Sequence, residues 1–179
     1  MNNVYVESIK NIQINNEVCE KIKLNNKKDV SKKAWSYLYE LLKEYNINLL
    51  EEEIIYINNQ KPYIKNNPIY FNISHSNNMI AIVIADTECS IDIEYINMNK
   101  NHDKIVNKLF SNDEQLIYSN HPNKLEYFYE LWTKKESCFK LTGEGIKISK
   151  FSEIQYSNNI KSYLFINDNE SYYVSYIIL

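Results

Sequence analysis

The chain has 179 residues, of which 44% are hydrophobic and 24% are charged, and its formal net charge is −3. This length suits one domain or two small lobes that share a core, and a chain of this size buries about 70% of its unfolded surface. The slight acidic excess excludes a protein that binds polyanions over its whole surface, so nucleic acid is not an expected partner and any phosphate must meet a local basic patch.

The N-terminal part opens with a short apolar segment at residues 4–9 and then becomes rich in lysine. Six lysines lie between Lys21 and Lys33, together with one carboxylate, Asp29. This patch is either the solvated start of a helix or a local site for phosphate. Asp29 is a suitable N-cap for a helix with an apolar stripe formed by Val30, Ala34, Leu38, Leu41, Leu42 and Tyr45.

Four strands are predicted after this helix. Clusters of Asn, Pro and Asp separate them, and their positions are residues 54–57, 69–73, 79–85 and 90–96. The third, MIAIVIA, is apolar throughout and is therefore predicted to be the central strand of a sheet.

The second half repeats the order of helix and strand. Helices are predicted at residues 102–109, 112–119 and 124–141, and strands at 154–156, 161–166 and 172–178. The dipeptides Asn158-Asn159 and Asp168-Asn169 are predicted hairpin turns. The pattern indicates an α+β protein of two similar sheet-plus-helix lobes, residues 1–96 and 97–179, packed as one globular unit without a linker.

Three carboxylates stand out by their spacing. Asp92 and Glu94 occupy alternate positions of a predicted strand and so point the same way, while Glu136 and Lys140 are four residues apart on one helix face. A solvent-facing edge strand would show the same alternation, but the neighbouring isoleucines favour a buried strand. We expect Asp92, Glu94 and Glu136 to lie within reach of one cation, and any metal bound there should be a hard cation with oxygen ligands.

Other site classes are excluded by composition. With two glycines, Gly143 and Gly145, the chain supplies neither a P-loop nor a dinucleotide fingerprint. The three cysteines are far apart and no signal-peptide pattern opens the chain, so a cytoplasmic protein without disulfides is expected. No histidine lies at zinc-ligand spacing, and no apolar run approaches the roughly 20 residues that cross a bilayer.

Four motifs then carry a family resemblance. They are FNISHS at 71–76, SIDIE at 90–94, FSNDE at 110–114 and FYELWTKKESCFKLTGEGI at 128–146, with a weaker echo in KKDVSKK at 27–33. Their order and spacing resemble those of the surfactin-type 4′-phosphopantetheinyl transferases. The resemblance implies two lobes related by pseudo-two-fold symmetry and a Mg²⁺-dependent transfer of the phosphopantetheine arm of coenzyme A to a serine of an apo carrier protein, with release of adenosine 3′,5′-bisphosphate.

The resemblance also implies roles for individual residues. Asp92, Glu94 and Glu136 would hold the metal, and Lys140, more than Lys135, would clamp the pyrophosphate. His75 resembles the family histidine that reaches the 3′-phosphate of coenzyme A, whereas its residue type alone suggests a hydrogen-bonded structural histidine. Further predicted contacts to coenzyme A are Lys28, Lys32, Lys61, Pro62 and Ser74.

Glu114 has two interpretations. The resemblance implies that it positions or deprotonates the carrier serine, but Ser111 and Glu114 also form a capping-box pattern at a helix start. For carrier docking we expect a helical stripe at Ile105, Val106 and Leu109, followed by Phe110 and flanked by lysines. The same stripe would equally suit a core.

Two departures from the family pattern are visible. Gln60 and Ser90 stand where relatives usually carry glycine, and the basic residues of this chain are all lysines. The expected partners are coenzyme A and apo acyl, peptidyl or polyketide carrier proteins, with the enzyme a monomer. An alternative is a module of the same fold that binds carrier proteins with little transfer, and a third is a Mg²⁺-dependent transferase acting on another nucleotide diphosphate.

Overall fold

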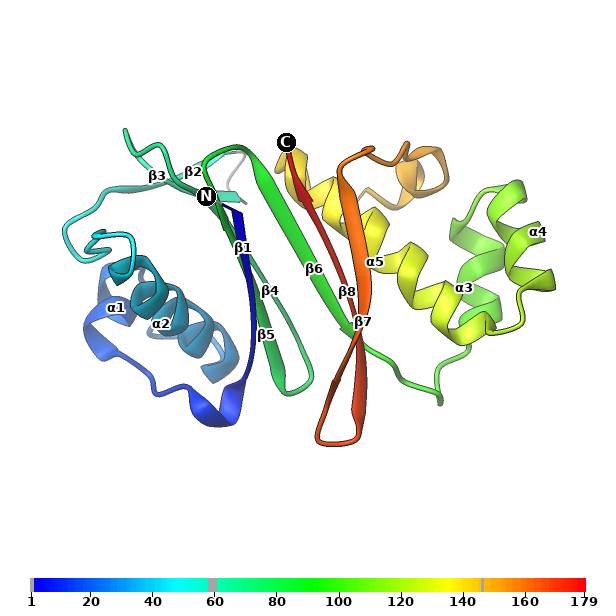
Figure 1. Cartoon of the computed structure of the whole chain (residues 1–179), viewed down its shortest axis with the longest axis horizontal. Helices are drawn as coiled ribbons and strands as arrows, with labels where there is room; N and C mark the ends of the chain where they lie inside the picture. Colours follow the sequence, from blue (N-terminus) through cyan, green and yellow to red (C-terminus); the bar gives the residue numbers. More distant parts are fainter. Residues whose placement is uncertain (1, 58–60, 146) are drawn as a thin grey trace.

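The computed structural model describes residues 2–57, 61–145 and 147–179. Two three-stranded antiparallel sheets lie side by side in the middle of the molecule, and helices cover the outer side of each (Figure 1). The first half contains β1 (Asn2–Ser8), η1 (Ile9–Asn11), α1 (Asn16–Lys21), α2 (Asp29–Lys43), β2 (Ile54–Ile57), β3 (Lys61–Ile64), β4 (Tyr70–Ser76) and β5 (Met79–Ala85). The second half contains β6 (Cys89–Tyr95), α3 (His102–Leu109), α4 (Asn112–Asn120), α5 (Lys124–Thr142), η2 (Ile148–Glu153), β7 (Ile160–Asn167) and β8 (Glu170–Ile178).

The two halves have the same topology. The first sheet has the order β1-β5-β4 and the second the order β6-β8-β7. In each half a strand is followed by a long helix and then by a hairpin whose second strand pairs with the first strand. This repeat confirms the α+β class and the two similar lobes.

The strand pairing bears on the lobe boundary. β6 pairs with β8 along its whole length, from Cys89 to Tyr95. A boundary at residue 96 would separate β6 from the sheet to which it belongs. We therefore propose that the lobes divide in the short turn between β5 and β6 rather than at the predicted position.

Burial explains why these segments form these elements. Every residue of β5 is buried, which confirms its central position, and α2 buries Ala34, Leu38, Leu41 and Leu42 against the first sheet. A second cluster fills the space between the two sheets, where Met79 and Val83 meet Ile91 and Val174. A third, rich in aromatic rings, lies between α3, α5 and the segment at 148–156.

Several local predictions need correction. Lys28, not Asp29, is the N-cap of α2, and no side chain caps this helix. Residues 154–156 do not form a strand, so Asn158 and Asn159 join no hairpin. The Asp168-Asn169 turn is confirmed, because both residues have positive φ angles, 48° and 65°, as a tight hairpin turn requires. The short elements α1 and β3 were not predicted.

Within the described residues, no helix combines the length and the apolar character that crossing a bilayer requires. Gln60 and Ile146 lie outside the described residues, so the structure gives no account of the departure at position 60.

Candidate active site

The three predicted carboxylates meet in one cluster. Asp92 and Glu94 project from β6 toward α5, and Glu136 projects from α5 toward β6. One carboxylate oxygen from each residue lies within 4.8 Å of the others. The alternation of the strand and the turn of the helix therefore bring the acidic groups together as their spacing indicates.

Two carboxylates of the cluster are buried. Asp92 is 1% exposed and Glu136 is 9% exposed. Burial, followed by the negative charge of Asp92, raises the pKa of Glu136 to about 8, and the same two causes raise the pKa of Glu94. Three ionised carboxylates in this arrangement repel one another, and a bound cation would stabilise them.

Asp92 provides a direct test of whether a metal fits. Its Oδ1 atom accepts hydrogen bonds from Lys140 and from Ser74, whereas its buried Oδ2 atom has no hydrogen-bond partner among the described residues. Buried carboxylate oxygens are rarely left without a partner. An oxygen-only donor set with an unused buried oxygen fits Mg²⁺, which prefers carboxylates together with phosphate oxygens and water.

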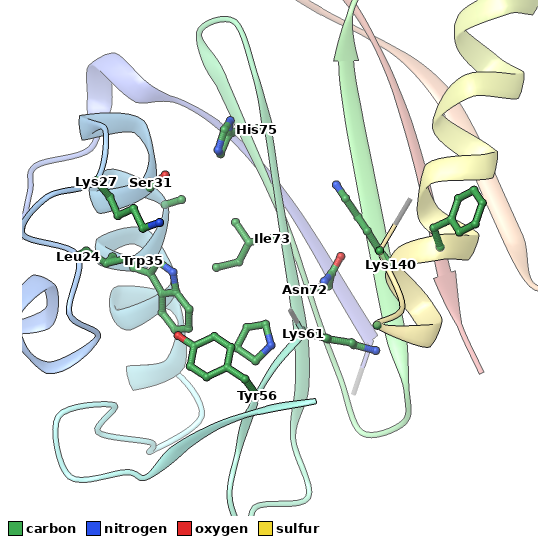
Figure 2. Close-up of a pocket in the computed structure, with 15 residues that line it drawn as sticks. Leu24, Lys27, Ser31, Trp35, Tyr56, Lys61, Asn72, Ile73, His75 and Lys140 are labelled. Atoms are coloured by element: carbon green, nitrogen blue, oxygen red, sulfur yellow. The ribbon is translucent and has the colours of Figure 1, made fainter. Parts of the chain in front are cut away.

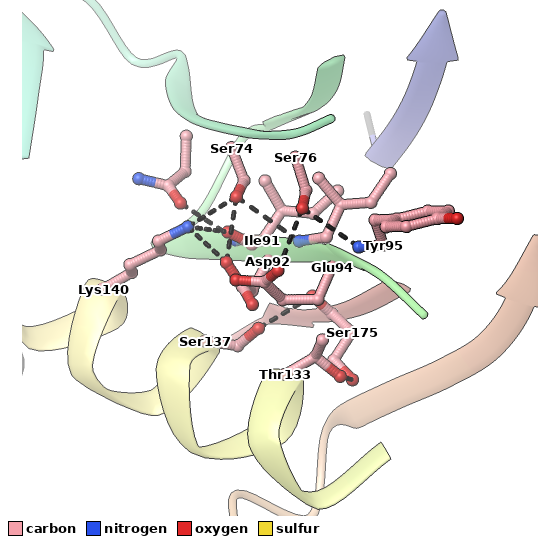
Figure 3. A network of polar contacts seen from close by, with 12 residues as sticks. Ser74, Ser76, Ile91, Asp92, Glu94, Tyr95, Thr133, Ser137, Lys140 and Ser175 are labelled. Atoms are coloured by element: carbon pink, nitrogen blue, oxygen red, sulfur yellow. Dashed lines mark hydrogen bonds and ion pairs between the residues drawn. The ribbon is translucent and has the colours of Figure 1, made fainter. Parts of the chain in front are cut away.

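Lys140 links the cluster to a cleft. Its ammonium nitrogen lies 2.6 Å from Asp92 Oδ1, 2.7 Å from Ser74 Oγ and 3.2 Å from the Ile91 carbonyl oxygen (Figure 3). The same side chain lines a cleft of about 600 Å³ between the lobes. A positive charge thus lies between the acidic cluster and this cleft.

The cleft is bounded by both lobes. Figure 2 shows Lys27, Ser31 and Trp35 on the side of α2, with His75 on β4 and Lys140 on α5 across from them. The remaining described lining residues are Leu24, Ala34, Tyr56, Lys61, Pro62, Asn72, Ile73, Phe139, Gly143 and Gly145. Apolar and aromatic walls with a few basic groups suit a nucleotide that carries phosphates.

His75 lies at the rim of this cleft. Partial desolvation in the cleft wall, followed by the positive charges of Lys140 and Lys28, lowers its pKa, although Asp92 and its own backbone act in the opposite direction. The imidazole is therefore neutral near pH 7 until a nearby anion raises its pKa again.

Lys28 and Lys32, the predicted coenzyme A contacts at the start of α2, have different surroundings. Lys28 lies close enough to His75 to influence its pKa, while Lys32 makes a long ion pair with Asp29, at 3.7 Å. Neither is among the described residues that line the cleft, whereas Lys27 and Ser31 are. These two residues were missed, although the lysine-rich segment that contains them was noted.

Lys61 lines the cleft but uses its ammonium elsewhere. The nitrogen lies 2.6 Å from Glu88 Oε2 and 3.2 Å from the Leu141 carbonyl oxygen, and the residue is 3% exposed. Tyr63 also donates a hydrogen bond to Glu88. Lys61 therefore ties β3 to the end of α5, and its charge is already compensated.

Glu114 and Lys135 form a separate buried pair. Lys135 is fully buried and donates hydrogen bonds to Glu114 and to the Phe151 carbonyl oxygen. Its neighbour Glu136 points to the carboxylate cluster, but Lys135 points into the aromatic core. Because its ammonium does not reach the cleft, the predicted pyrophosphate clamp at Lys135 needs correction, and we assign this lysine to the core.

The predicted docking stripe also needs correction. Val106 is 1% exposed and Phe110 is 3% exposed, and both belong to the third core cluster, against which Ile105 and Leu109 also pack. The stripe is core, because α3 turns its apolar face toward α5. Exposed apolar side chains instead occur nearby at Met98, Leu116 and Ile117.

Known proteins share the part of the chain that holds this cluster. A model of the 4′-phosphopantetheinyl transferase superfamily matches residues 88–177, about half of the chain. The 4′-phosphopantetheinyl transferase AcpT of Escherichia coli O157:H7 is 38% identical over 95 residues, which cover 51% of this chain and 49% of that protein.

Two further relatives are similar. The 4′-phosphopantetheinyl transferase of Bacillus subtilis is 37% identical over 91 residues, covering 49% of this chain and 40% of that protein. The 4′-phosphopantetheinyl transferase gsp of Aneurinibacillus migulanus is 35% identical over 115 residues, covering 60% and 47%. The chain thus spans about half the length of the curated relatives it matches.

Proposed function

The chain belongs to the 4′-phosphopantetheinyl transferase superfamily, and on that premise we propose that it transfers the 4′-phosphopantetheine arm of coenzyme A to a serine of an apo carrier protein. The observation that carries the proposal is the cluster of Asp92, Glu94 and Glu136 next to Lys140, at the edge of a cleft with basic and aromatic walls. A bond forms between the serine oxygen and the phosphorus that bears the pantetheine. The bridging oxygen leaves with adenosine 3′,5′-bisphosphate, and the serine proton is released.

Asp92, Glu94 and Glu136 are the residues that would hold Mg²⁺. When bound, this ion supplies charge neutralisation to the diphosphate of coenzyme A. The Oδ2 atom of Asp92, which has no partner among the described residues, and the raised pKa values of Glu94 and Glu136 support this assignment.

The basic residues of the cleft have separate tasks in this proposal. Lys140 meets the diphosphate, because it lines the cleft and touches the metal carboxylate Asp92. His75, with Lys27 and Lys28 close to the same rim, meets the 3′-phosphate. Trp35 and Tyr56 offer aromatic surface to the adenine ring.

We assign Glu114 to structure rather than to proton transfer. Its Oε1 accepts hydrogen bonds from Lys135 and Tyr156, and its Oε2 accepts one from the backbone N–H of Ser111. These bonds outweigh the effect of burial, which alone would raise the pKa, so that the pKa of Glu114 is lowered. A carboxylate whose ionised form is stabilised in this way is a weak base.

The partners in this proposal are coenzyme A and apo acyl, peptidyl or polyketide carrier proteins. Met98, Leu116 and Ile117 offer exposed apolar area in the segment that follows the metal strand, which suits docking of a carrier protein. Leu116→Ser should then raise the KM for the carrier protein and leave the KM for coenzyme A unchanged. The cytoplasmic location and the monomeric state stay predictions.

Intact-mass analysis tests the function. The protein is incubated with coenzyme A, Mg²⁺ and a panel of apo acyl, peptidyl and polyketide carrier proteins, and each carrier is examined for the added phosphopantetheine. Asp92→Asn should abolish the mass increment, while the exposed control Glu40→Gln should keep it. Carriers that bind tightly but never gain the increment would instead support the alternative of a binding module. An increment that persists in Asp92→Asn would contradict the metal assignment.

A further inference from the structure

The lobes meet through side chains where β4 passes β6. These strands belong to different sheets, yet three alternate β4 residues accept hydrogen bonds from backbone N–H groups of β6. The three pairs are Asn72 with Ile91 at 3.0 Å, Ser74 with Ile93 at 3.4 Å, and Ser76 with Tyr95 at 3.0 Å. Each pair is separated by 19 residues in sequence, so the two strands run in the same direction.

The two serines of this junction have a second bond. Ser74 Oγ donates to Asp92 Oδ1 and Ser76 Oγ donates to Glu94 Oε2, each at 2.9 Å (Figure 3). A hydroxyl has one proton and two lone pairs, so each serine can donate to a carboxylate while it accepts from the β6 backbone. The hydroxyls that join the lobes therefore also orient two of the three carboxylates.

Ser76 can be separated from the coenzyme site, whereas Ser74 cannot. Ser74 also accepts a hydrogen bond from Lys140 and is a predicted contact to coenzyme A. Ser76 is not among the described residues that line the cleft, and the described polar contacts of its side chain are Glu94 Oε2 and the Tyr95 N–H. A change at Ser76 should therefore reach the reaction through Glu94.

We propose that Ser76 is a positioning residue that holds the carboxylate of Glu94 in the metal cluster. Glu94 is only partly buried, which allows its long side chain to turn toward solvent, and repulsion by Asp92 favours that movement. The bond from Ser76, fixed in turn by the Tyr95 N–H, opposes that movement. This inference rests on the metal site of the proposed function. It adds Ser76 to that site, whereas its sequence neighbour His75 lines the cleft.

Direct metal binding tests the role of Ser76 without measuring turnover. Mn²⁺ is titrated into coenzyme-free protein and free Mn²⁺ is followed by electron paramagnetic resonance. Loss of a hydrogen bond that supports a metal ligand lowers affinity by about 10- to 100-fold, so Ser76→Ala should bind Mn²⁺ that much more weakly. Ser76→Thr keeps the hydroxyl and should restore affinity to within a few fold of the wild type.

Ser36→Ala is a matched control. Ser36 is buried, whereas Ser76 is half-buried, but Ser36 likewise accepts a hydrogen bond from a backbone N–H group, that of Asn15. Ser36 donates one to the Lys32 carbonyl oxygen, and none of its described hydrogen bonds is to a carboxylate. Both alanine variants should lower the melting temperature, and Ser76→Ala alone should weaken Mn²⁺ binding. If Ser76→Ala does not fold, Ser76→Cys, a weaker donor of similar size, should show the same loss of Mn²⁺ affinity.

The outcomes distinguish this inference from the proposed function. Unchanged Mn²⁺ affinity in Ser76→Ala or Ser76→Cys, with normal binding by the wild type, would overturn the role of Ser76 and leave the metal site intact. Equal losses in the Ser76 and Ser36 variants would also overturn it, because they would indicate a general loss of stability. If the wild type does not bind Mn²⁺ at all, both the metal assignment and the role of Ser76 are wrong.

Discussion

Glu114 Oε1 lies 2.8 Å from the ammonium nitrogen of Lys135, and the Lys135 side chain is fully buried. The ammonium also lies 5.4 to 5.6 Å from the ring centroids of Phe110, Phe151 and Tyr156. A buried ammonium in aromatic surroundings depends on its carboxylate partner, because removing that partner leaves an uncompensated charge away from water. The pair joins the start of α4 to the middle of α5.

Glu114→Gln should therefore destabilise the protein strongly. Breaking a buried ion pair costs about 3 to 5 kcal/mol, which corresponds to a fall in melting temperature of about 6 to 20 °C for a chain of this length. The capping box should survive, since Gln also serves at that helix position. Differential scanning calorimetry measures the loss.

A double variant separates stability from catalysis. Glu114→Gln with Lys135→Met removes both charges and should recover most of the lost stability, because a well-packed apolar side chain replaces the ammonium. We expect this double variant to retain turnover within about tenfold of the wild type. A stable double variant whose turnover falls by about 10² to 10⁴ would instead identify Glu114 as a general base.

Removing either partner of the ion pair between Lys61 and Glu88 should have a different cost in stability. Lys61 is buried, but the Glu88 side chain is 37% exposed and can be solvated when its partner is lost. Lys61→Met should therefore cost only about 1 to 2 kcal/mol, whereas Glu88→Ala should cost more because it leaves the buried ammonium unpaired. Urea unfolding of the two variants measures the difference.

Coenzyme kinetics decide whether Lys61 serves structure, by tying β3 to α5, or binds a phosphate of coenzyme A. If Lys61 ties β3 to α5, Lys61→Met should change the KM for coenzyme A and for 3′-dephospho-coenzyme A by the same factor. A larger change for coenzyme A would show that Lys61 contacts the 3′-phosphate. His75→Ala serves as the positive control, because its effect should be confined to the phosphorylated substrate.

Local periodicity predicted those parts of the site that lie on one element. Asp92 and Glu94 alternate along β6, and Glu136 and Lys140 are one helical turn apart, so short-range geometry fixes their directions. Lys135 and Glu136 are neighbours in sequence, but about 100° around α5 separates them. The sequence carries no sign of which lysine enters the core, because that depends on packing against α4 and the segment at 148–156.

Contacts between distant segments were beyond prediction for the same reason. Glu88, 27 residues from Lys61, and Tyr156, 42 residues from Glu114, find their partners only in the folded chain. The missing strand at residues 154–156 is related to this. Ile154 and Tyr156 look like strand residues, but they pack against the third core cluster, and the hydroxyl of Tyr156 donates a hydrogen bond to Glu114.

The lowered pKa of His75 predicts proton uptake when coenzyme A binds. The neutral imidazole should become protonated beside the 3′-phosphate, so its pKa is higher in the complex than in the free protein. The stabilising ion pair is then present below the bound-state pKa and lost as pH rises through it. The ratio of affinities for coenzyme A and 3′-dephospho-coenzyme A should therefore fall as pH rises from the lowered pKa of the free protein to the higher pKa of the complex.

Calorimetry in buffers of different ionisation heat measures this proton uptake. The difference in protons bound between the two substrates should disappear in His75→Ala. Lys124→Ala, on an exposed helix start, should leave the difference unchanged. Equal proton uptake for both substrates in the wild type would show that His75 does not meet the 3′-phosphate.

Burial of Glu136 predicts that the stability of the metal-free protein also falls as pH rises. Its pKa is about 8 in the folded state, mainly through burial, whereas an unfolded glutamate ionises near 4.5. Between these values the folded protein keeps a proton that the unfolded chain has lost, so the free energy of unfolding falls as pH rises and the fall ends above about pH 8. Each pH unit in this window corresponds to at most about 1.4 kcal/mol from this group.

Glu136→Gln cannot ionise and should have a flatter profile, with the variant more stable than the wild type at pH 8 in the presence of a chelator. The exposed variant Glu40→Gln should keep the wild-type slope. Urea unfolding at pH 6, 7 and 8 measures all three, and parallel profiles for the wild type and Glu136→Gln would show that Glu136 does not share a buried acidic cluster with Asp92.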